Sequence, residues 1–127
     1  MEDFIKGLFR DTIENKNYDE KLIDKYFSED YVQMVDDQTL DFDTFKKHIR
    51  KLKDKLQQVD VQFSNIASNE TSVFTKHYVN SILKNGESVK HKVFAEFQIK
   101  NGKVIQCDEL TLLIEGDKSE SNLGSTL

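Results

Sequence analysis

Two Asn-Gly pairs in the second half of the chain constrain its fold more than any other feature. They are Asn85–Gly86 and Asn101–Gly102. Both residue types tolerate the positive φ angles of tight hairpin turns, so each pair predicts a reversal between two antiparallel strands. The flanking segments 72–84, 88–100 and 103–115 are therefore predicted to be three long strands that lie side by side in one sheet.

The first half of the chain has helical periodicity instead. Apolar residues recur at helical spacing from Phe4 to Ile13 and again from Leu22 to Phe27, which predicts two helices. The first helix is expected to end near residues 15–17. Asn17 can cap the second helix, with Glu20 three residues later.

A third helix is predicted after Asp41, which is a good N-cap. Its apolar stripe consists of Phe42, Phe45, Ile49, Leu52 and Leu56. A short strand, 31–35, precedes this helix. After Leu56 the apolar period changes from three and four to two, so a further strand is predicted from residue 59.

This order predicts an α+β fold in which three N-terminal helices cover one face of a curved antiparallel sheet. Such a sheet forms a cone with an open mouth, where ligand pockets are common. The 127 residues contain no repeat and no second hydrophobic pattern, so we expect a single domain, 1–127, with a polar C-terminal tail at 116–127.

Composition excludes several classes of function. The net charge of −5 and the scattered lysines disfavour a nucleic-acid partner. No apolar run approaches the ~20 residues of a membrane span, and the N-terminal residues do not form a signal peptide, so we expect no membrane partner. Cys107 is the only cysteine, which suits a reducing compartment and predicts a cytoplasmic protein.

We expect neither a cofactor nor a metal. The sequence has no P-loop, nucleophile elbow or dinucleotide-binding fingerprint. Its three histidines, His48, His77 and His91, lie on separate predicted elements without the short spacing of metal ligands.

Two segments, YFSEDYV after the second helix and IKNGKVIQCDELT near the end, resemble the nuclear transport factor 2-like superfamily. The resemblance is to the SnoaL-like and ketosteroid-isomerase-like branch, and it runs from about Phe4 to Glu115. It implies a cone-shaped sheet over three helices and a homodimer formed through the outer sheet face. The superfamily contains isomerases, cyclases, dehydratases, hydrolases and binding domains, so the resemblance implies a fold and no particular reaction.

Hairpin geometry predicts which side chains face the helices. A two-residue turn at Asn85–Gly86 places alternate residues of both strands on the inner face. The predicted inner residues are Phe74, Lys76, Tyr78, Asn80 and Ile82 on one strand and His91, Val93, Ala95 and Phe97 on the next.

The Asn101–Gly102 hairpin leaves two registers open. A two-residue turn brings Gln106, Asp108 and Leu110 inward, and a three-residue loop brings Cys107, Glu109 and Thr111 inward. The resemblance favours the second register. The outer face then carries Thr75, His77, Val79, Phe94, Glu96, Leu110 and Leu112, and it is too apolar for a bare surface.

The candidate ligand-binding residues of the predicted pocket are Tyr31, Gln33, His48, Tyr78, His91 and Glu109. Candidate catalytic residues are Glu109, Asp36 and His48, because an acid or an imidazole in an apolar cavity can move a proton. Each also has a structural interpretation. Asp36 and Asp37 can simply turn the chain, His48 can be a half-buried helix flank, and Glu109 can be a paired structural acid.

Steroid isomerisation itself is not expected. By the resemblance, the general base of ketosteroid isomerase falls on Val35, or on Asp36 after a one-residue slip. Its protonated acid falls on Ala95, which cannot donate a proton, and the first predicted helix contains no tyrosine.

Three functional hypotheses remain. The first is a SnoaL-like protein that binds a small apolar molecule carrying one or two oxygens in the cone. The second is a cofactor-independent acid–base enzyme of the isomerase, dehydratase or cyclase type. The third is a dimeric partner-binding module that works through its outer face.

Overall fold

The structure is a computed structural model, and it describes residues 1–117. Most of the predicted tail, from residue 118 on, therefore lies outside the described residues. The helical elements are α1 (Glu2–Leu8), the π-helical turn η1 (Phe9–Ile13), α2 (Glu20–Tyr26) and α3 (Phe42–Lys55). The strands are β1 (Phe27–Val35), β2 (Gln38–Asp41), β3 (Leu56–Ser68), β4 (Ser72–Leu83), β5 (Ser88–Lys100) and β6 (Lys103–Glu115).

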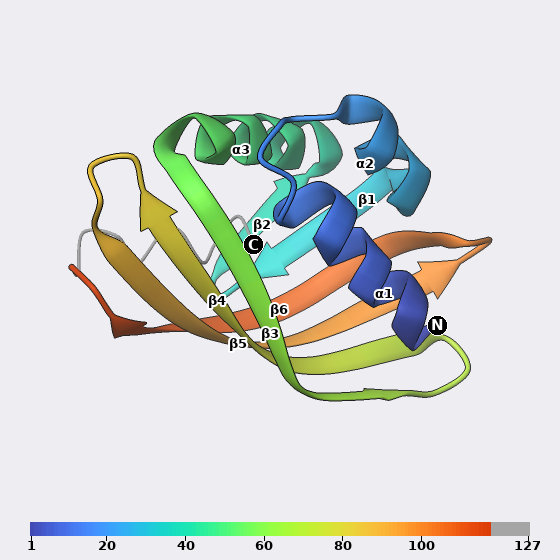
Figure 1. Cartoon of the computed structure of the whole chain (residues 1–127). Helices are drawn as coiled ribbons and strands as arrows, with labels where there is room; N and C mark the ends of the chain where they lie inside the picture. Colours follow the sequence, from blue (N-terminus) through green and yellow to red (C-terminus); the bar gives the residue numbers. More distant parts are fainter. Residues whose placement is uncertain (118–127) are drawn as a thin grey trace.

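The strands form one six-stranded sheet in the order β2-β1-β6-β5-β4-β3. Neighbouring strands are antiparallel except β1 and β6, which run parallel. Figure 1 shows the helices together on one side of the sheet, which curves around them. The predicted α+β class and the layer of three helices are confirmed. No helix among residues 1–117 is long and apolar enough to cross a membrane.

Side-chain caps decide where two of the helices begin. Asp41 accepts a hydrogen bond from the Thr44 N–H at 2.8 Å, so the predicted cap of α3 is confirmed. The predicted cap of α2, Asn17, is wrong. Asp19 takes that role and accepts from the N–H of Leu22 at 3.2 Å.

Aromatic rings from several elements fill one end of the space between helices and sheet. Phe27 and Tyr31 of β1 lie with ring centroids 4.6 Å apart, and Phe45 of α3 lies 4.9 Å from Tyr31. A residual cavity of about 10 Å³ is lined in part by these rings. That volume is about enough for one water molecule, so this end of the core is closely packed.

The hairpin between β4 and β5 corrects the predicted register. The Leu83 N–H donates to the carbonyl of Glu87 and the Gly86 N–H donates to the carbonyl of Leu83, both at 2.9 Å. The loop therefore has three residues, 84–86, and Gly86 at its end has φ +91°. Glycine takes this left-handed angle without strain, which permits the longer loop.

The longer loop moves the register of β4 by one residue and exchanges its two faces. The inner residues of β4 are Val73, Thr75, His77, Val79 and Ser81, all of them buried. Tyr78 lies on the outer face with Phe74 and Lys76, so its predicted inward position is wrong. His77, Thr75 and Val79, predicted to face outward, are corrected in the same way.

The β5–β6 hairpin has a two-residue turn. Lys100 pairs with Lys103, and Asn101 and Gly102 both have positive φ angles, 53° and 75°. The three-residue loop that the resemblance favoured is therefore wrong.

The inward residues favoured for β6 are nevertheless confirmed. Ile99 pairs with Val104, whereas Gln98 pairs with Gln106, so β6 holds one extra residue between these pairs. This bulge shifts the register by one. As a result Cys107 and Glu109 are buried on the inner face.

Sequence patterns did not predict β2. Asp36 has φ 54°, and after Asp37 the chain reverses into β2, whose Gln38 pairs with Val35. Aspartate is one of the few residue types that tolerate this left-handed backbone. The acid pair thus forms the turn of a short hairpin at the edge of the sheet.

Candidate functional site

A buried chain of three polar side chains runs across the inner face of β1 and β6. The Tyr31 hydroxyl donates to Gln33 Oε1 at 3.0 Å, and Gln33 Nε2 donates to Glu109 Oε1 at 3.0 Å. The alternation of β1 turns Tyr31 and Gln33 inward, and the parallel pairing of β1 with β6 brings Glu109 opposite Val35. All three polar residues are at most 2 % exposed.

The surroundings of Glu109 favour the protonated form of its carboxyl. Burial, and next the negative charge of Asp36, raise the pKa of Glu109 from 4.5 to about 8, although the bond from Gln33 acts in the opposite direction. Its second oxygen, Oε2, is buried and has no hydrogen-bond partner among residues 1–117. At neutral pH this group is therefore largely a neutral carboxyl, which can donate as well as accept a hydrogen bond.

The buried titratable neighbours of Glu109, Tyr31 and Cys107, are also uncharged. Burial raises the pKa of Tyr31 and of Cys107 well above their ordinary values. The Cys107 thiol therefore stays protonated at neutral pH, and its burial suits packing better than nucleophilic attack.

Asp36 lies just outside this buried chain. Its Oδ1 accepts from the Thr111 N–H at 2.9 Å, its Oδ2 accepts from the Thr111 hydroxyl at 2.8 Å, and its own N–H donates to the carbonyl of Glu109. Both carboxylate oxygens thus bind β6, and the residue is exposed. These contacts agree with the structural interpretation of the acid pair.

The three other candidate residues occupy different places. His91 is fully buried on the inner face of β5, as predicted, and pairs with Leu113 of β6. His48 is half-buried on α3 next to the buried Ile49. Tyr78 lies on the outer face, where the Lys90 ammonium stands 5.0 Å from the centre of its ring.

Comparisons with known proteins agree with this architecture. Uncharacterized protein C11D3.04c of Schizosaccharomyces pombe is 32 % identical over 124 residues, which cover 98 % of this chain and 95 % of the yeast protein. An NTF2-like protein of unknown function from Exiguobacterium sp. 255-15 superposes with a TM-score of 0.67 at 16 % identity, over 87 % of this chain and 98 % of that one. The chain belongs to the same family as the yeast protein. It shares its fold with the NTF2-like structure.

A SnoaL-like protein from Jannaschia sp. CCS1 superposes with a TM-score of 0.70 at 12 % identity, over 86 % of this chain and 83 % of that one. No family model matches the sequence. At these identities the solved structures share the fold alone, and the side chains of the site decide the chemistry.

The fold of this chain also buries a histidine that the predicted register missed. His77 is fully buried on β4, with its ring centroid 4.9 Å from that of Phe9, and its Nδ1 lies 2.9 Å from the Thr75 hydroxyl. Burial lowers the pKa of His77 from 6.5 to about 4, so the ring is neutral. The sequence signal for its position was that His77 alternates in step with the apolar Val73 and Val79. The assumed two-residue turn placed all three on the outer face.

Among residues 1–117, no three His, Cys, Asp or Glu side chains come close enough together to hold a metal ion.

Proposed function

We propose that this protein binds a compact, mainly apolar small molecule that carries one or two oxygens, with the Glu109 carboxyl as the group that recognises an oxygen. One observation carries the proposal. Glu109 is 1 % exposed, its pKa is raised to about 8, and its Oε2 has no hydrogen-bond partner among the described residues.

The neighbouring polar side chains support a definite direction of hydrogen bonding. Because Tyr31 has only one hydroxyl proton and donates it to Gln33 Oε1, the amide of Gln33 is oriented with Nε2 toward Glu109. Oε1 of Glu109 is thereby an acceptor, which leaves the proton for Oε2. A buried O–H without an acceptor costs about 1–3 kcal/mol, and an oxygen of a ligand would recover this cost.

Glu109 lies on the inner face, where a ligand in the cone requires the core to open around the present cavity of about 10 Å³. Glu109 pairs directly with Ala95 of β5, the position at which the family resemblance places the protonated acid of ketosteroid isomerases. The small side chain of Ala95 lies between two polar side chains of the inner face, Glu109 on β6 and Thr75 on β4, which both pair with it. An apolar wall with a few convergent polar groups is typical of small-molecule sites.

The experiment is extraction and mass spectrometry of small molecules that co-purify with the protein, followed by rebinding of the extracted compound to ligand-free protein. We expect an apolar, oxygen-bearing compound that binds to wild type and to Glu115→Gln, an exposed position on the same strand. The same compound should bind at least tenfold more weakly to Glu109→Leu, which has no hydrogen-bonding group. Equal affinity for Glu109→Leu would contradict the role of Glu109.

Acid–base catalysis is the second candidate, because a carboxyl with a pKa of about 8 can both give and take a proton near neutral pH. In this alternative Glu109 moves a proton on the bound molecule during isomerisation, dehydration or cyclisation. Turnover of the extracted compound by wild type but not by Glu109→Gln would favour catalysis over binding alone.

We propose in addition that the protein forms a two-fold homodimer through the outer face of β4, β5 and β6. Large apolar side chains are exposed on this face, namely Phe74, Phe94, Leu110, Leu112 and Ile114, and Leu110 is 65 % exposed. A contiguous apolar surface of this kind favours burial against a second surface. Sedimentation equilibrium should give a dimer for wild type and a monomer for Leu110→Asp, while an unchanged dimer in Leu110→Asp would contradict the proposal.

A further inference from the structure

The outer face carries opposite charges on the two sides of its apolar centre. Lys92, Phe94 and Glu96 follow one another at intervals of two on β5, so all three project from the outer face. Phe94 is 51 % exposed and pairs directly with Leu110 of β6. Along β5 a cation therefore lies on one side of the apolar centre and an anion on the other.

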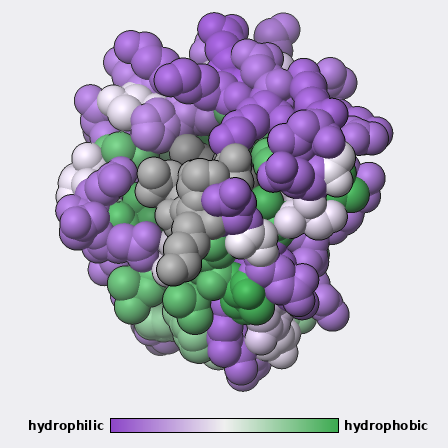
Figure 2. Space-filling model, turned by 90° about the vertical axis from the view of Figure 1, so that its left-hand side faces the viewer, coloured by the Kyte–Doolittle hydropathy of each residue, from purple (hydrophilic) through white to green (hydrophobic). Residues whose placement is uncertain are grey.

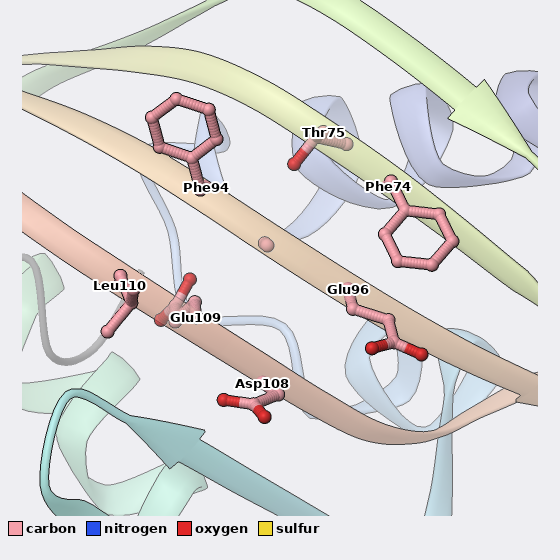
Figure 3. Close-up of a pocket in the computed structure, with 8 residues that line it drawn as sticks. Phe74, Thr75, Phe94, Glu96, Asp108, Glu109 and Leu110 are labelled. Carbon is pink, nitrogen blue, oxygen red and sulfur yellow. The ribbon is translucent and has the colours of Figure 1, made fainter.

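The acidic side forms a groove with two carboxylates. Glu96 on β5 pairs directly with Asp108 on β6, and the groove around them has a volume of about 280 Å³. Figure 3 shows this groove, with Phe74, Phe94 and Leu110 around the two acids and the helices behind the sheet. Like charges directly across a strand pair repel one another, so a cation in the groove would stabilise it.

Figure 2 shows the molecule from the left-hand side of Figure 1, coloured from hydrophilic to hydrophobic. Hydrophobic side chains gather in the lower half of that view, below the hydrophilic surface on the side of α3. Lys92 belongs to the sheet, and its ammonium stands 5.5 Å from the ring centroid of Phe94. This cation is thus held at the border of the apolar centre.

We infer that two copies pack outer face to outer face about a two-fold axis that crosses the strands at Phe94, so that Lys92 of each copy enters the Glu96–Asp108 groove of the other. An axis across the strands exchanges the basic and acidic sides, so each cation meets an acid pair. An axis along β5 would instead place Lys92 on Lys92 and Glu96 on Glu96, which are two like-charge contacts. The axis across the strands leaves one, between the two Lys76 side chains. The exchanged arrangement keeps the strands of the two sheets aligned, as is common in face-to-face packing.

This inference rests on the proposed homodimer and adds its registration, which charge reversal tests directly. Lys92→Glu brings a third carboxylate to the acid pair at both symmetric contacts. Glu96→Lys places a lysine against Lys92 at both contacts, with Asp108 as the acid that remains beside it. Each variant alone should raise the dimer dissociation constant by roughly 100-fold. In an equimolar mixture of the two, both contacts again join a cation to an anion, so native mass spectrometry should show a heterodimer with an affinity near that of wild type.

Lys76→Glu is the matched control. Lys76 is half-buried on the same face and pairs with Phe94, so it lies on the proposed axis and meets its own copy. Its charge reversal should not create a preference for heterodimers with Glu96→Lys. The registration would be overturned if Lys76→Glu formed heterodimers with Glu96→Lys and Lys92→Glu did not. That result would mean that the strands of the two sheets cross, with Lys76 of one copy against Glu96 of the other.

The outcomes separate the two proposals. A wild-type protein that stays monomeric at high micromolar concentration overturns the homodimer and the registration with it. A wild-type dimer whose dissociation constant is unchanged by Lys92→Glu and by Glu96→Lys overturns the registration alone. Far-UV circular dichroism of each variant establishes that it is folded, and recovery of dimers in the mixture cannot arise from unfolded chains.

Discussion

Gln33 of β1 donates its side-chain amide to Oε1 of Glu109 of β6 over 3.0 Å, across the one parallel strand pair of the sheet. This bond places the acceptor role of the carboxyl on one oxygen and leaves a proton for the other. The state of that proton governs the proposed ligand contact, and it also couples folding to pH.

Glu109→Gln should remove a loss of stability that accompanies a rise in pH from 4.5 to about 8. The pKa of Glu109 is raised from 4.5 to about 8, so its contribution is fully present below pH 4.5 and is lost as the pH rises through about 8. Between pH 6.5 and 8 we expect the free energy of unfolding to fall by at most about 1.4 kcal/mol per pH unit in wild type, and by much less in the variant. Urea titrations at several pH values measure this, with Glu115→Gln as control. The same slope in both proteins would contradict a buried, protonated Glu109.

Titration of His77 should change the free energy of unfolding with pH in the direction opposite to that of Glu109. Its pKa is lowered from 6.5 to about 4, so its contribution is present above pH 6.5 and is lost as the pH falls through about 4. Because Glu109 opposes this effect between pH 4.5 and 6.5, the measurement is best made in Glu109→Gln. Acidification over that range should destabilise Glu109→Gln by at most about 1.4 kcal/mol per pH unit. Adding His77→Gln should remove most of this slope, whereas adding His48→Gln, at a half-buried position, should leave it.

Asp36 should stabilise the fold through its side chain and through its backbone. Asp36→Gly removes both hydrogen bonds to Thr111 and is expected to cost about 1–2 kcal/mol. Asp36→Ala should cost roughly 1 kcal/mol more than Asp36→Gly, because φ at this residue is 54° and alanine is strained there. Thermal unfolding of both variants and of Asp37→Ala tests this. An alanine variant as stable as the glycine variant would contradict the strain.

The Cys107 thiol should be inert in the folded protein. It is 2 % exposed, and burial raises its pKa well above the ordinary value. A disulfide reagent at pH 8 should label it at least 100-fold more slowly in buffer than in denaturant, since labelling requires opening of the sheet. Rapid labelling of the native protein would show that the inner face of β6 is open to reagents.

The strands of the second half and the helix start at Asp41 were predictable, because their signals are local. An Asn-Gly pair reverses the chain through its own backbone angles, and an aspartate caps the helix that directly follows it. The inward positions of Tyr31, Gln33, His91 and Glu109 were predicted as well. Tyr78 was assigned to the wrong face because the Asn-Gly pair is compatible with a turn of two residues and with a loop of three. The two lengths differ by one residue in the register of β4.

Local sequence alone determined an α+β domain with long antiparallel hairpins and an acid on its last strand. Only the tertiary structure decided that His77 faces the core, that a bulge turns Glu109 inward and that Gln33 meets it from a strand far away in the chain. The physical reason is that side chains alternate along a strand, so one extra residue in a loop or strand reverses every following position. Which register is stable depends on burial against the helices, and that burial exists only in the folded chain.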